Sequence, residues 1–406
     1  MKVYGEQVKV HEEARVLIIE GSASPPAFVR NLILGLASHP LIRVAVLTKK
    51  AAIKSLSGVP ILASDFERFT SVRIVSWLAV EFVRRPGRML EAMRLTTPAR
   101  TSREWLKRWY RTGLILSFEP SILHFQWATH IDAYSRLILA RRFKCVVSLR
   151  GSQINIRPIV DLQVNELYRK LFPECYFHAV SEAMKRRVLR YGVSEDHVKV
   201  IYSFVPQSFF DAYDAARSEK EQPLRVLSIG RCHWIKGYWY AIEAIKLLRA
   251  KGINVHYTMV LQGGPTQEIL YQIEDRDLKD HVTILDGIRH FEVINLMKQH
   301  DVLLLSSVEE GIANVVLEAM ALGLPVISTN CGGMREIVMD GETGWLVPIR
   351  NPLAISDALE RFMHLSDADV LVVRRKAHQL VKAKCSANAN SDTFADWYAS
   401  IVCGNQ

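Results

Sequence analysis

The sequence lacks any long uncharged apolar run, although hydrophobic residues make up 49% of its 406 residues. No stretch approaches the ~18 consecutive apolar residues that a transmembrane helix needs. Residues 1–13 are polar and charged, so they also lack the apolar core of a signal peptide. Both absences predict a cytoplasmic protein, whose contact with a membrane would be peripheral and on its inner face.

Cysteine is scarce, and the six that are present form no CxxC pair and no metal-ligand spacing. We therefore expect reduced thiols. The 13 histidines form no HExxH motif. A GxSxG elbow is missing, and so is a GxGxxG fingerprint after the opening strands, which argues against an NAD enzyme. The sequence predicts no metal and no cofactor.

Acidic residues are in the minority, and the formal net charge is +10. Between Phe82 and Arg111, nine basic residues face only Glu91 and Glu104. Basic helices with interleaved aromatic residues suit an anionic membrane surface, so residues 77–111 are a candidate peripheral contact. The alternatives are a solvated helical insert and nucleic acid, but the rest of the chain shows no nucleic-acid motif. The aromatic residues are Trp77, Phe82, Trp105, Trp109 and Tyr110, and the basic ones are Arg84, Arg85, Arg88, Arg94, Arg100, Arg103, Lys107, Arg108 and Arg111.

Short apolar runs alternate with helical patterns along the whole chain, which predicts an α/β protein with parallel sheets. The length favours two domains, because one core seldom grows beyond ~300 residues. The polar segment 216–223 is the expected linker, between an N-terminal Rossmann-like domain (1–215) and a C-terminal one (224–389). Both domains would be doubly wound and would face each other across a cleft. A last helix, 390–403, is expected to pack back on the first domain.

One local pattern indicates an anion site. The apolar strand 301–305 is followed by a loop that carries Glu310, and a helix begins near Ala313. The free N–H groups and the positive dipole end of that helix would point into the cleft. Glu318 lies in an otherwise apolar helix, where a carboxylate is costly unless it is hydrogen-bonded. The two hydroxyls of a ribose would supply such bonds.

The surrounding residues resemble a known family. Glu310-Gly is followed by Leu317-Glu-Ala-Met-Ala-x-Gly-x-Pro-Val-Ile, then by Gly332-Gly and Gly341-Glu-Thr-Gly-Trp-Leu-Val. This pattern resembles glycosyltransferase family 4 across residues 226–347. The resemblance implies the GT-B architecture, two Rossmann-like domains around a nucleotide-sugar site, with retention at the anomeric carbon.

The resemblance implies roles for these residues. Glu310 would face the hydroxyls of the donor sugar near the reacting carbon, and Glu318 would hold the ribose. The loop from Gly230 to Gly237 is similar to the family's Gly-Arg-x-x-x-x-Lys-Gly loop, so Arg231 and Lys236 would bind the diphosphate. The catalytic set is thus Glu310, Arg231 and Lys236, and the donor-binding set is Gly230, Gly264, Ile288, Arg289, Gly311, Ile312, Ala313, Asn314 and Glu318.

The first half of the chain is less similar to the family. Gln126 and Trp127 follow the strand 122–125 and are expected to line the acceptor side. Arg150 stands where many members have a histidine, so it could bind a phosphate or an acid on the acceptor, or support the fold. Gly21 and Ser22 follow the first strand and are expected to contact substrate.

We therefore expect a hexosyltransferase-type enzyme that uses a UDP-, GDP- or similar sugar and needs no metal. Its acceptor would be a saccharide or a lipid-linked saccharide in the synthesis of a cell-surface polysaccharide or glycoconjugate. Two alternatives stay open: a non-catalytic GT-B partner subunit, and a nucleotide-sugar epimerase on the same scaffold.

Overall fold

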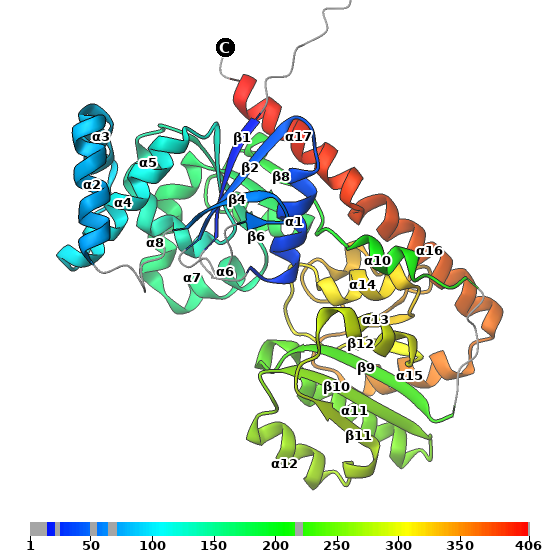
Figure 1. Cartoon of the computed structure of the whole chain (residues 1–406). Helices are drawn as coiled ribbons and strands as arrows, with labels where there is room; N and C mark the ends of the chain where they lie inside the picture. Colours follow the sequence, from blue (N-terminus) through cyan, green and yellow to red (C-terminus); the bar gives the residue numbers. More distant parts are fainter. Residues whose placement is uncertain (1–13, 21–24, 49–54, 64–70, 216–221, 405–406) are drawn as a thin grey trace, which may run out of the picture.

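The computed structural model describes residues 14–20, 25–48, 55–63, 71–215 and 222–404. The described residues form two sheets, each with a hydrophobic core on both of its faces (Figure 1). None of the helices in these ranges is long and apolar enough to cross a membrane. The strands and helices alternate along the chain, so the predicted α/β fold is confirmed.

The first sheet has the strand order β3-β4-β2-β1-β5-β6-β7-β8 and is parallel except for the β3–β4 pair. Helix α1 (Ala27–Ala37) contributes to the core on one face. Helices α5 (Ser135–Leu139), α8 (Leu162–Leu171) and α9 (Glu182–Leu189) contribute to the core on the other. The strands are β1 (Ala14–Ile19), β2 (Ile42–Thr48), β3 (Ser55–Leu56), β4 (Val59–Ala63), β5 (Ile122–Phe125), β6 (Lys144–Leu149), β7 (Tyr176–Ala179) and β8 (Val198–Val200).

The second sheet is parallel, with the order β11-β10-β9-β12-β13-β14. One face packs against α11 (Tyr238–Ala250), α12 (Gln267–Asp275) and α15 (Pro352–His364). The other packs against α10 (Gln207–Asp211), α13 (His290–Lys298), α14 (Asn314–Leu322) and α16 (Asp367–Cys385). The strands are β9 (Leu224–Arg231), β10 (Val255–Gln262), β11 (Val282–Leu285), β12 (Val302–Leu305), β13 (Val326–Thr329) and β14 (Trp345–Val347).

The last helix, α17 (Ala387–Cys403), returns to the first sheet and joins the core that α1 covers (Figure 1). Its Tyr398 hydroxyl lies 2.7 Å from Nδ1 of His124 on β5. The Ser148 hydroxyl lies 2.8 Å from Nε2 of His124 and 2.8 Å from Nδ1 of His178. This buried polar chain runs from α17 through three neighbouring strands, so it fixes the helix on the first sheet.

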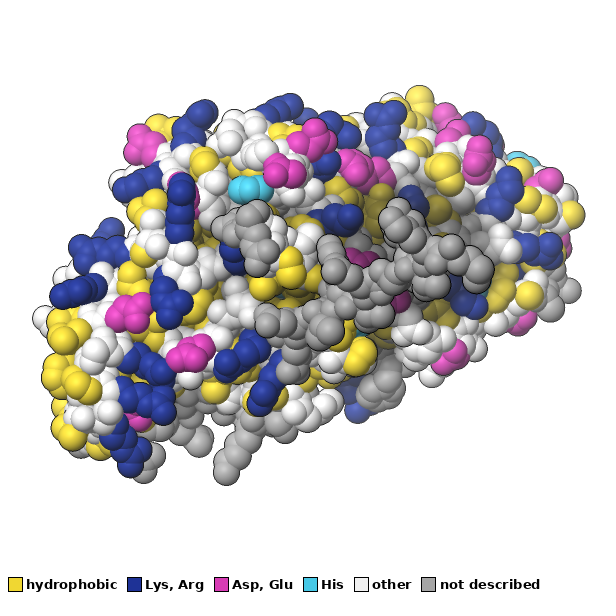
Figure 2. Space-filling model, turned by 90° about the horizontal axis from the view of Figure 1, so that it is seen from above, with side chains coloured by type: hydrophobic (Ala, Val, Ile, Leu, Met, Phe, Trp, Pro, Cys, Tyr) yellow, Lys and Arg dark blue, Asp and Glu magenta, His cyan; other side chains and the backbone are white. Residues whose placement is uncertain are grey.

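A three-helix insert joins β4 to β5 and stands at one end of the molecule (Figure 1). It consists of α2 (Ser71–Arg84), α3 (Pro86–Leu95) and α4 (Ser102–Phe118). Three of its aromatic residues pack inside the insert: Trp77 meets Tyr110 edge to face, and Nε1 of Trp109 donates to the carbonyl of Met89. The exposed apolar residues are instead Val75, Val80, Phe82, Val83, Leu90 and Met93. Figure 2 shows basic and hydrophobic side chains intermixed at this end.

Short helices complete the fold: α6 (Ser152–Asn155) and α7 (Arg157–Val160) follow β6 directly. They place a segment of the first half opposite the loops of the second sheet. Between β5 and β6 the 3-10 segment η1 (Ala128–Tyr134) leads into the short α5. Thr129 of η1 lines the cavity described next.

Candidate functional site

A cavity of about 1000 Å³ lies between the two halves, beyond the carboxyl ends of β6, β9 and β12. Ligands of doubly wound sheets bind at this edge of the strands. The first half contributes Arg150 and the segment that begins at Gly151, and the second contributes Arg231, Lys236 and Glu310. The predicted catalytic set is therefore brought together in one cavity.

A partly buried ion pair lies in this cavity. The Lys236 ammonium lies 2.6 Å from Oε1 of Glu310, and these side chains are only 17% and 14% exposed. The Ser307 hydroxyl donates to the same carboxylate oxygen at 2.8 Å. Both donors reach Oε1, which holds the carboxylate in one orientation. Arg231, at the end of β9, is exposed and lines the same cavity.

The loop that carries Lys236 is held rigidly against the end of β12. Ser306 Oγ donates to the Lys236 carbonyl at 2.9 Å, and the Val308 N–H donates to the Ile235 carbonyl at 2.8 Å. Gly237 has a φ of 63°, and a Cβ there would overlap the carbonyl oxygen of Ser306. Only glycine allows so close an approach, which explains its place after the lysine.

The two halves touch directly beside Glu310. A Cβ on Gly311 would lie 2.8 Å from the carbonyl oxygen of Arg150. Nδ2 of Asn155 donates to Oε1 of Glu309 across the cleft at 2.7 Å. Burial raises the pKa of Glu309, while the Asn155 amide acts in the opposite direction. Sequence reasoning missed Glu309, because only the fold reveals its partner in the other half.

Arg150 forms the wall of the cavity on the side of the first sheet. Its Nη2 donates to Oε1 of the buried Gln126 at 2.7 Å, and its guanidinium lies 4.8 Å from the Phe28 ring centre. Burial lowers the pKa of Arg150 to about 10, so the group stays protonated at neutral pH. Trp127 packs edge-on against Phe28, and its Nε1 lies 3.4 Å from Oε1 of Glu20. Gly21 and Ser22 lie outside the described residues.

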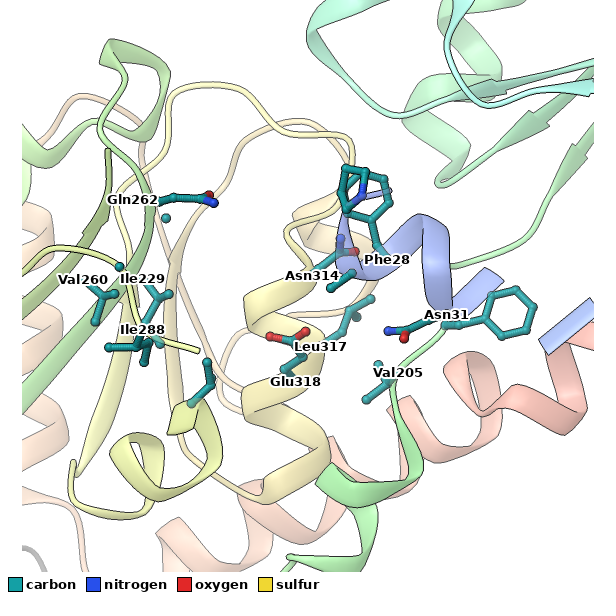
Figure 3. A pocket seen from close by; sticks show the side chains of 16 residues that line it. Phe28, Asn31, Val205, Ile229, Val260, Gln262, Ile288, Asn314, Leu317 and Glu318 are labelled. Atoms are coloured by element: carbon teal, nitrogen blue, oxygen red, sulfur yellow. The ribbon is translucent and has the colours of Figure 1, made fainter. Parts of the chain in front are cut away.

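Figure 3 shows a second cavity, of about 400 Å³. Gly230 lines it, and the next residue, Arg231, lines the first cavity. Asn314 and Glu318 of α14 line it from one side, one helical turn apart. Ile288 lines it from the loop after β11. Oδ1 of Asn314 is buried and has no hydrogen-bond partner in the described part of the chain. A buried acceptor in this state favours a ligand that donates a hydrogen bond, because leaving it unpaired costs about 1–3 kcal/mol.

The first half supplies the opposite wall of this second cavity, which the sequence did not reveal. Phe28 and Asn31 approach from α1, and Phe204 and Val205 from the segment after β8 (Figure 3). No motif singles these residues out, since their role depends on how the two sheets face each other.

Four residues of the predicted donor set do not line either cavity. Arg289 lies at the start of α13, where its Nη2 pairs with Glu292 at 2.8 Å. Ile312 and Ala313 are buried beneath the loop, and the Ala313 N–H lies 3.4 Å from Sδ of Met334. Gly264, with a φ of 76°, turns the chain after β10 near Asp286. The helix start is thus partly occupied by Met334, which reduces the number of N–H groups open to an anion.

The arrangement suits an anionic ligand that extends over both cavities. The larger one is lined by four cationic side chains and three carboxylates, and the smaller one by the Glu318 carboxylate and three amides. Among the residues that the structure describes, no group of three or more His, Cys, Asp or Glu side chains is placed to hold a metal.

The chain is similar to known proteins over much of its length. The family model for glycosyl transferases group 1 matches residues 209–383. The amylovoran biosynthesis glycosyltransferase AmsK of Erwinia amylovora is 27% identical over 269 residues, which cover 65% of each chain. The putative colanic acid biosynthesis glycosyltransferase WcaL of Salmonella typhimurium is 30% identical over 289 residues, 69% of this chain and 70% of WcaL. The match to AmsK thus spans just under two thirds of that relative.

Solved structures share the fold over nearly the whole chain. Anabaena Alr3699/HepE in complex with UDP and glucose has a TM-score of 0.72 at 17% identity, covering 96% of this chain and all of that one (100%). A glycosyltransferase from Rickettsia africae has a TM-score of 0.71 at 16% identity, with 97% and 100% covered. The predicted GT-B architecture is confirmed.

Proposed function

Since the chain belongs to the glycosyl transferases group 1 family, we propose that it moves a sugar from a nucleoside-diphosphate sugar to an acceptor in the cleft. The observation that carries this proposal is the Lys236–Glu310 pair beside Arg231, with Glu318 in the adjoining cavity. The larger cavity would take the sugar and diphosphate, and the smaller one the nucleoside.

The smaller cavity suits a nucleoside in both size and chemistry. Ile229, Ile288 and Val260 give it an apolar floor, against which a base can lie. The Glu318 carboxylate would accept hydrogen bonds from the ribose hydroxyls, and the unpaired Oδ1 of Asn314 offers a further acceptor. Hydrogen bonds to a charged group contribute about 1.5–3 kcal/mol each.

The bond that breaks joins the anomeric carbon to a diphosphate oxygen, so negative charge grows on the diphosphate. Arg231 can bind two of its oxygens, and Lys236 adds a point charge. Fixed charges placed where charge develops are among the largest contributions to catalysis. With these two cations the transfer would need no metal ion.

The new bond joins the anomeric carbon to an acceptor oxygen, whose proton leaves with the departing diphosphate. We infer retention of configuration, with the acceptor attacking from the face that the diphosphate leaves. Glu310 would hold hydroxyls of the donor sugar through the oxygen that Lys236 and Ser307 do not occupy. No enzymic nucleophile is invoked.

The acceptor would enter between the larger cavity and the first sheet, against Arg150. Gln126 is buried behind this arginine, and neither Gln126 nor Trp127 lines the larger cavity. Relatives named for amylovoran and colanic acid biosynthesis support an acceptor in polysaccharide assembly. The insert formed by α2–α4 combines exposed aliphatic residues with many arginines, which supports contact with an anionic membrane and hence a lipid-linked saccharide. Such contact would place the protein peripherally on the cytoplasmic face.

The test is a donor screen with UDP- and GDP-sugars that measures nucleotide release, followed by mass spectrometry of the products. Release that depends on an added saccharide or lipid-linked acceptor would support transfer. If titration calorimetry detects neither UDP nor GDP binding, the chain is a non-catalytic subunit and the proposal is wrong.

A further inference from the structure

A third cavity, of about 600 Å³, lies on the outer side of the loop that carries Arg231 and Lys236. Two tryptophans that are largely open to solvent dominate it: Trp234 is 63% exposed and Trp239 is 46% exposed. Tyr240 lies beside them on the first turn of α11. Exposed large aromatic side chains gathered in one hollow usually mark a binding surface.

This aromatic cavity adjoins the larger cavity of the cleft. His233 and Trp234 line both cavities, because the 3-10 turn η4 (Trp234–Lys236) forms the wall between them. On one side of this turn Lys236 pairs with Glu310, and on the other Trp234 is exposed. A chain-like ligand could therefore extend from the cleft over the turn and into the aromatic cavity.

The rim of the aromatic cavity carries groups that bond hydroxyls. Glu268 and Thr266 line it from the start of α12, and Arg350 from the loop after β14. The Thr266 hydroxyl beside Glu268 lowers the pKa of that carboxyl, which therefore stays ionised at neutral pH. Aromatic faces surrounded by a carboxylate, an arginine and a hydroxyl match a ligand with C–H faces and hydroxyl edges, as pyranose rings have.

We propose that this cavity, defined by Trp234, Trp239, Tyr240, Glu268 and Arg350, is a saccharide-binding subsite on the second domain. It would hold sugar residues of the acceptor chain that are remote from the reacting hydroxyl. This proposal rests on the transfer function proposed above for the cleft. A purely apolar partner fits less well, because the rim is charged and the rings are spaced around a hollow.

The subsite would raise the effective concentration of the acceptor's reacting end at the cleft. Sugar residues held on the tryptophans keep the reacting end near the cleft, so a second binding event becomes intramolecular. Short acceptors would miss this contact and bind more weakly. The geometry thus predicts a preference for longer saccharides, with no new contact at the reacting carbon.

The test is saturation-transfer difference NMR on the full chain, with maltohexaose, cellohexaose and laminarihexaose as probes and glucose as the short reference. The variants are Trp239→Ala, Trp239→Phe and the double change Trp234→Ala/Trp239→Ala. Tyr271→Ala is the matched control, because Tyr271 is 66% exposed on α12 and does not line the cavity. UDP affinity is measured for every variant as an independent reading of the nucleotide site.

We expect at least one hexasaccharide to bind better than glucose, and the double variant to weaken it by about tenfold or more. Trp239→Phe should retain part of the binding, and Tyr271→Ala all of it. The proposal is overturned if no hexasaccharide binds, or if the double variant binds as the wild type does. A change from dimer to monomer in the double variant, seen by analytical ultracentrifugation, would also overturn it by identifying the surface as a contact between copies.

The outcome separates this proposal from the transfer function. Loss of hexasaccharide binding with unchanged UDP affinity supports the subsite. If the wild type binds hexasaccharides but not UDP, the transfer function fails while the subsite stands. If the double variant also loses UDP, Trp239→Ala decides, because Trp239 lies outside the loop that carries the two cations.

Discussion

Lys236 and Glu310 face each other at 2.6 Å, from two loops at the ends of neighbouring strands of the second sheet. The carboxylate neutralises the ammonium in this pair. A diphosphate would compete for the ammonium, so donor binding and the orientation of Glu310 are coupled. The pair therefore links recognition of the leaving group to recognition of the sugar.

Removing the charge of Lys236 should impair catalysis more than binding. For Lys236→Met we expect kcat to fall by about 10²- to 10³-fold, since charge developing on the diphosphate loses a fixed partner. Nucleotide release with the best donor measures this. Lys251→Met is the control, because Lys251 pairs with Asp357 and Glu360 on the surface. Wild-type turnover in Lys236→Met would sink the assigned role.

Glu318 should matter for nucleotide affinity. Glu318→Gln replaces a charged acceptor of ribose hydroxyls with a neutral one, so we expect the Kd for the matching nucleoside diphosphate to rise roughly 10- to 100-fold. Titration calorimetry gives the value. Glu274→Gln, at an exposed position on α12, should leave it unchanged. Equal affinities for wild type and Glu318→Gln would contradict the placement of the ribose.

Substitutions at two glycines separate the effect of close packing on stability from that of backbone strain. Gly332 and Gly341 both have a positive φ, at 53° and 73°. A Cβ on Gly332 would overlap the carbonyl oxygen of Glu310, whereas nothing lies within 4 Å of one on Gly341. Gly341→Ala should cost about 1 kcal/mol in the free energy of unfolding, and Gly332→Ala about 1–3 kcal/mol more.

Chemical denaturation measures both changes, and activity provides a second reading. Gly332→Ala should also lower turnover, because the displaced loop carries Glu310. Equal stability of the two variants would mean that the loop yields freely and that its contact with Gly332 does not position Glu310.

Acid should destabilise the fold through the buried histidines of the first sheet. Burial and the charge of Arg150 lower the pKa of His178 to about 3, and burial also lowers that of His124. Both histidines are therefore neutral when folded, whereas an unfolded histidine titrates near pH 6.5. As the pH falls from about 6.5 towards 3, only the unfolded chain gains these protons, so stability is lost in that window.

The free energy of unfolding should be lower at pH 5 than at pH 7.5 by roughly 2 kcal/mol for each histidine. Urea unfolding at the two pH values measures this difference. His178→Gln should show a smaller difference between the two pH values. His364→Gln, at an exposed position, should keep the wild-type difference. An undiminished difference in His178→Gln would assign the acid sensitivity to other groups.

Membrane contact should depend on the apolar residues of the insert. Val83, at the end of α2, is 83% exposed and lies next to Arg84. Val83→Glu should reduce co-sedimentation with vesicles that contain phosphatidylserine, because it adds a charge that both the bilayer and the lipid headgroups disfavour. Val372→Glu on α16 is the control, at 53% exposure. Wild-type protein that fails to co-sediment at low salt would remove the membrane hypothesis.

The sequence by itself determined the order of strands and helices and the position of the donor loops. The predicted strands 122–125 and 301–305 lie within one residue of the observed β5 and β12, because apolar runs between helices indicate burial directly. Arg231, Lys236, Glu310 and Glu318 were identifiable because the residues around them resemble the motifs of a known family. Motifs of this kind are local, so they can be recognised in the sequence alone.

The tertiary structure alone decided which residues meet across the cleft. Asn155 and Glu309 are 154 positions apart and carry no motif, yet their side chains bond at 2.7 Å. Trp77 and Tyr110 of the insert pack against each other, and Arg289 pairs with Glu292 instead of lining a cavity. Contacts between distant segments depend on how two sheets pack, and that packing results from many small contributions that no local pattern records.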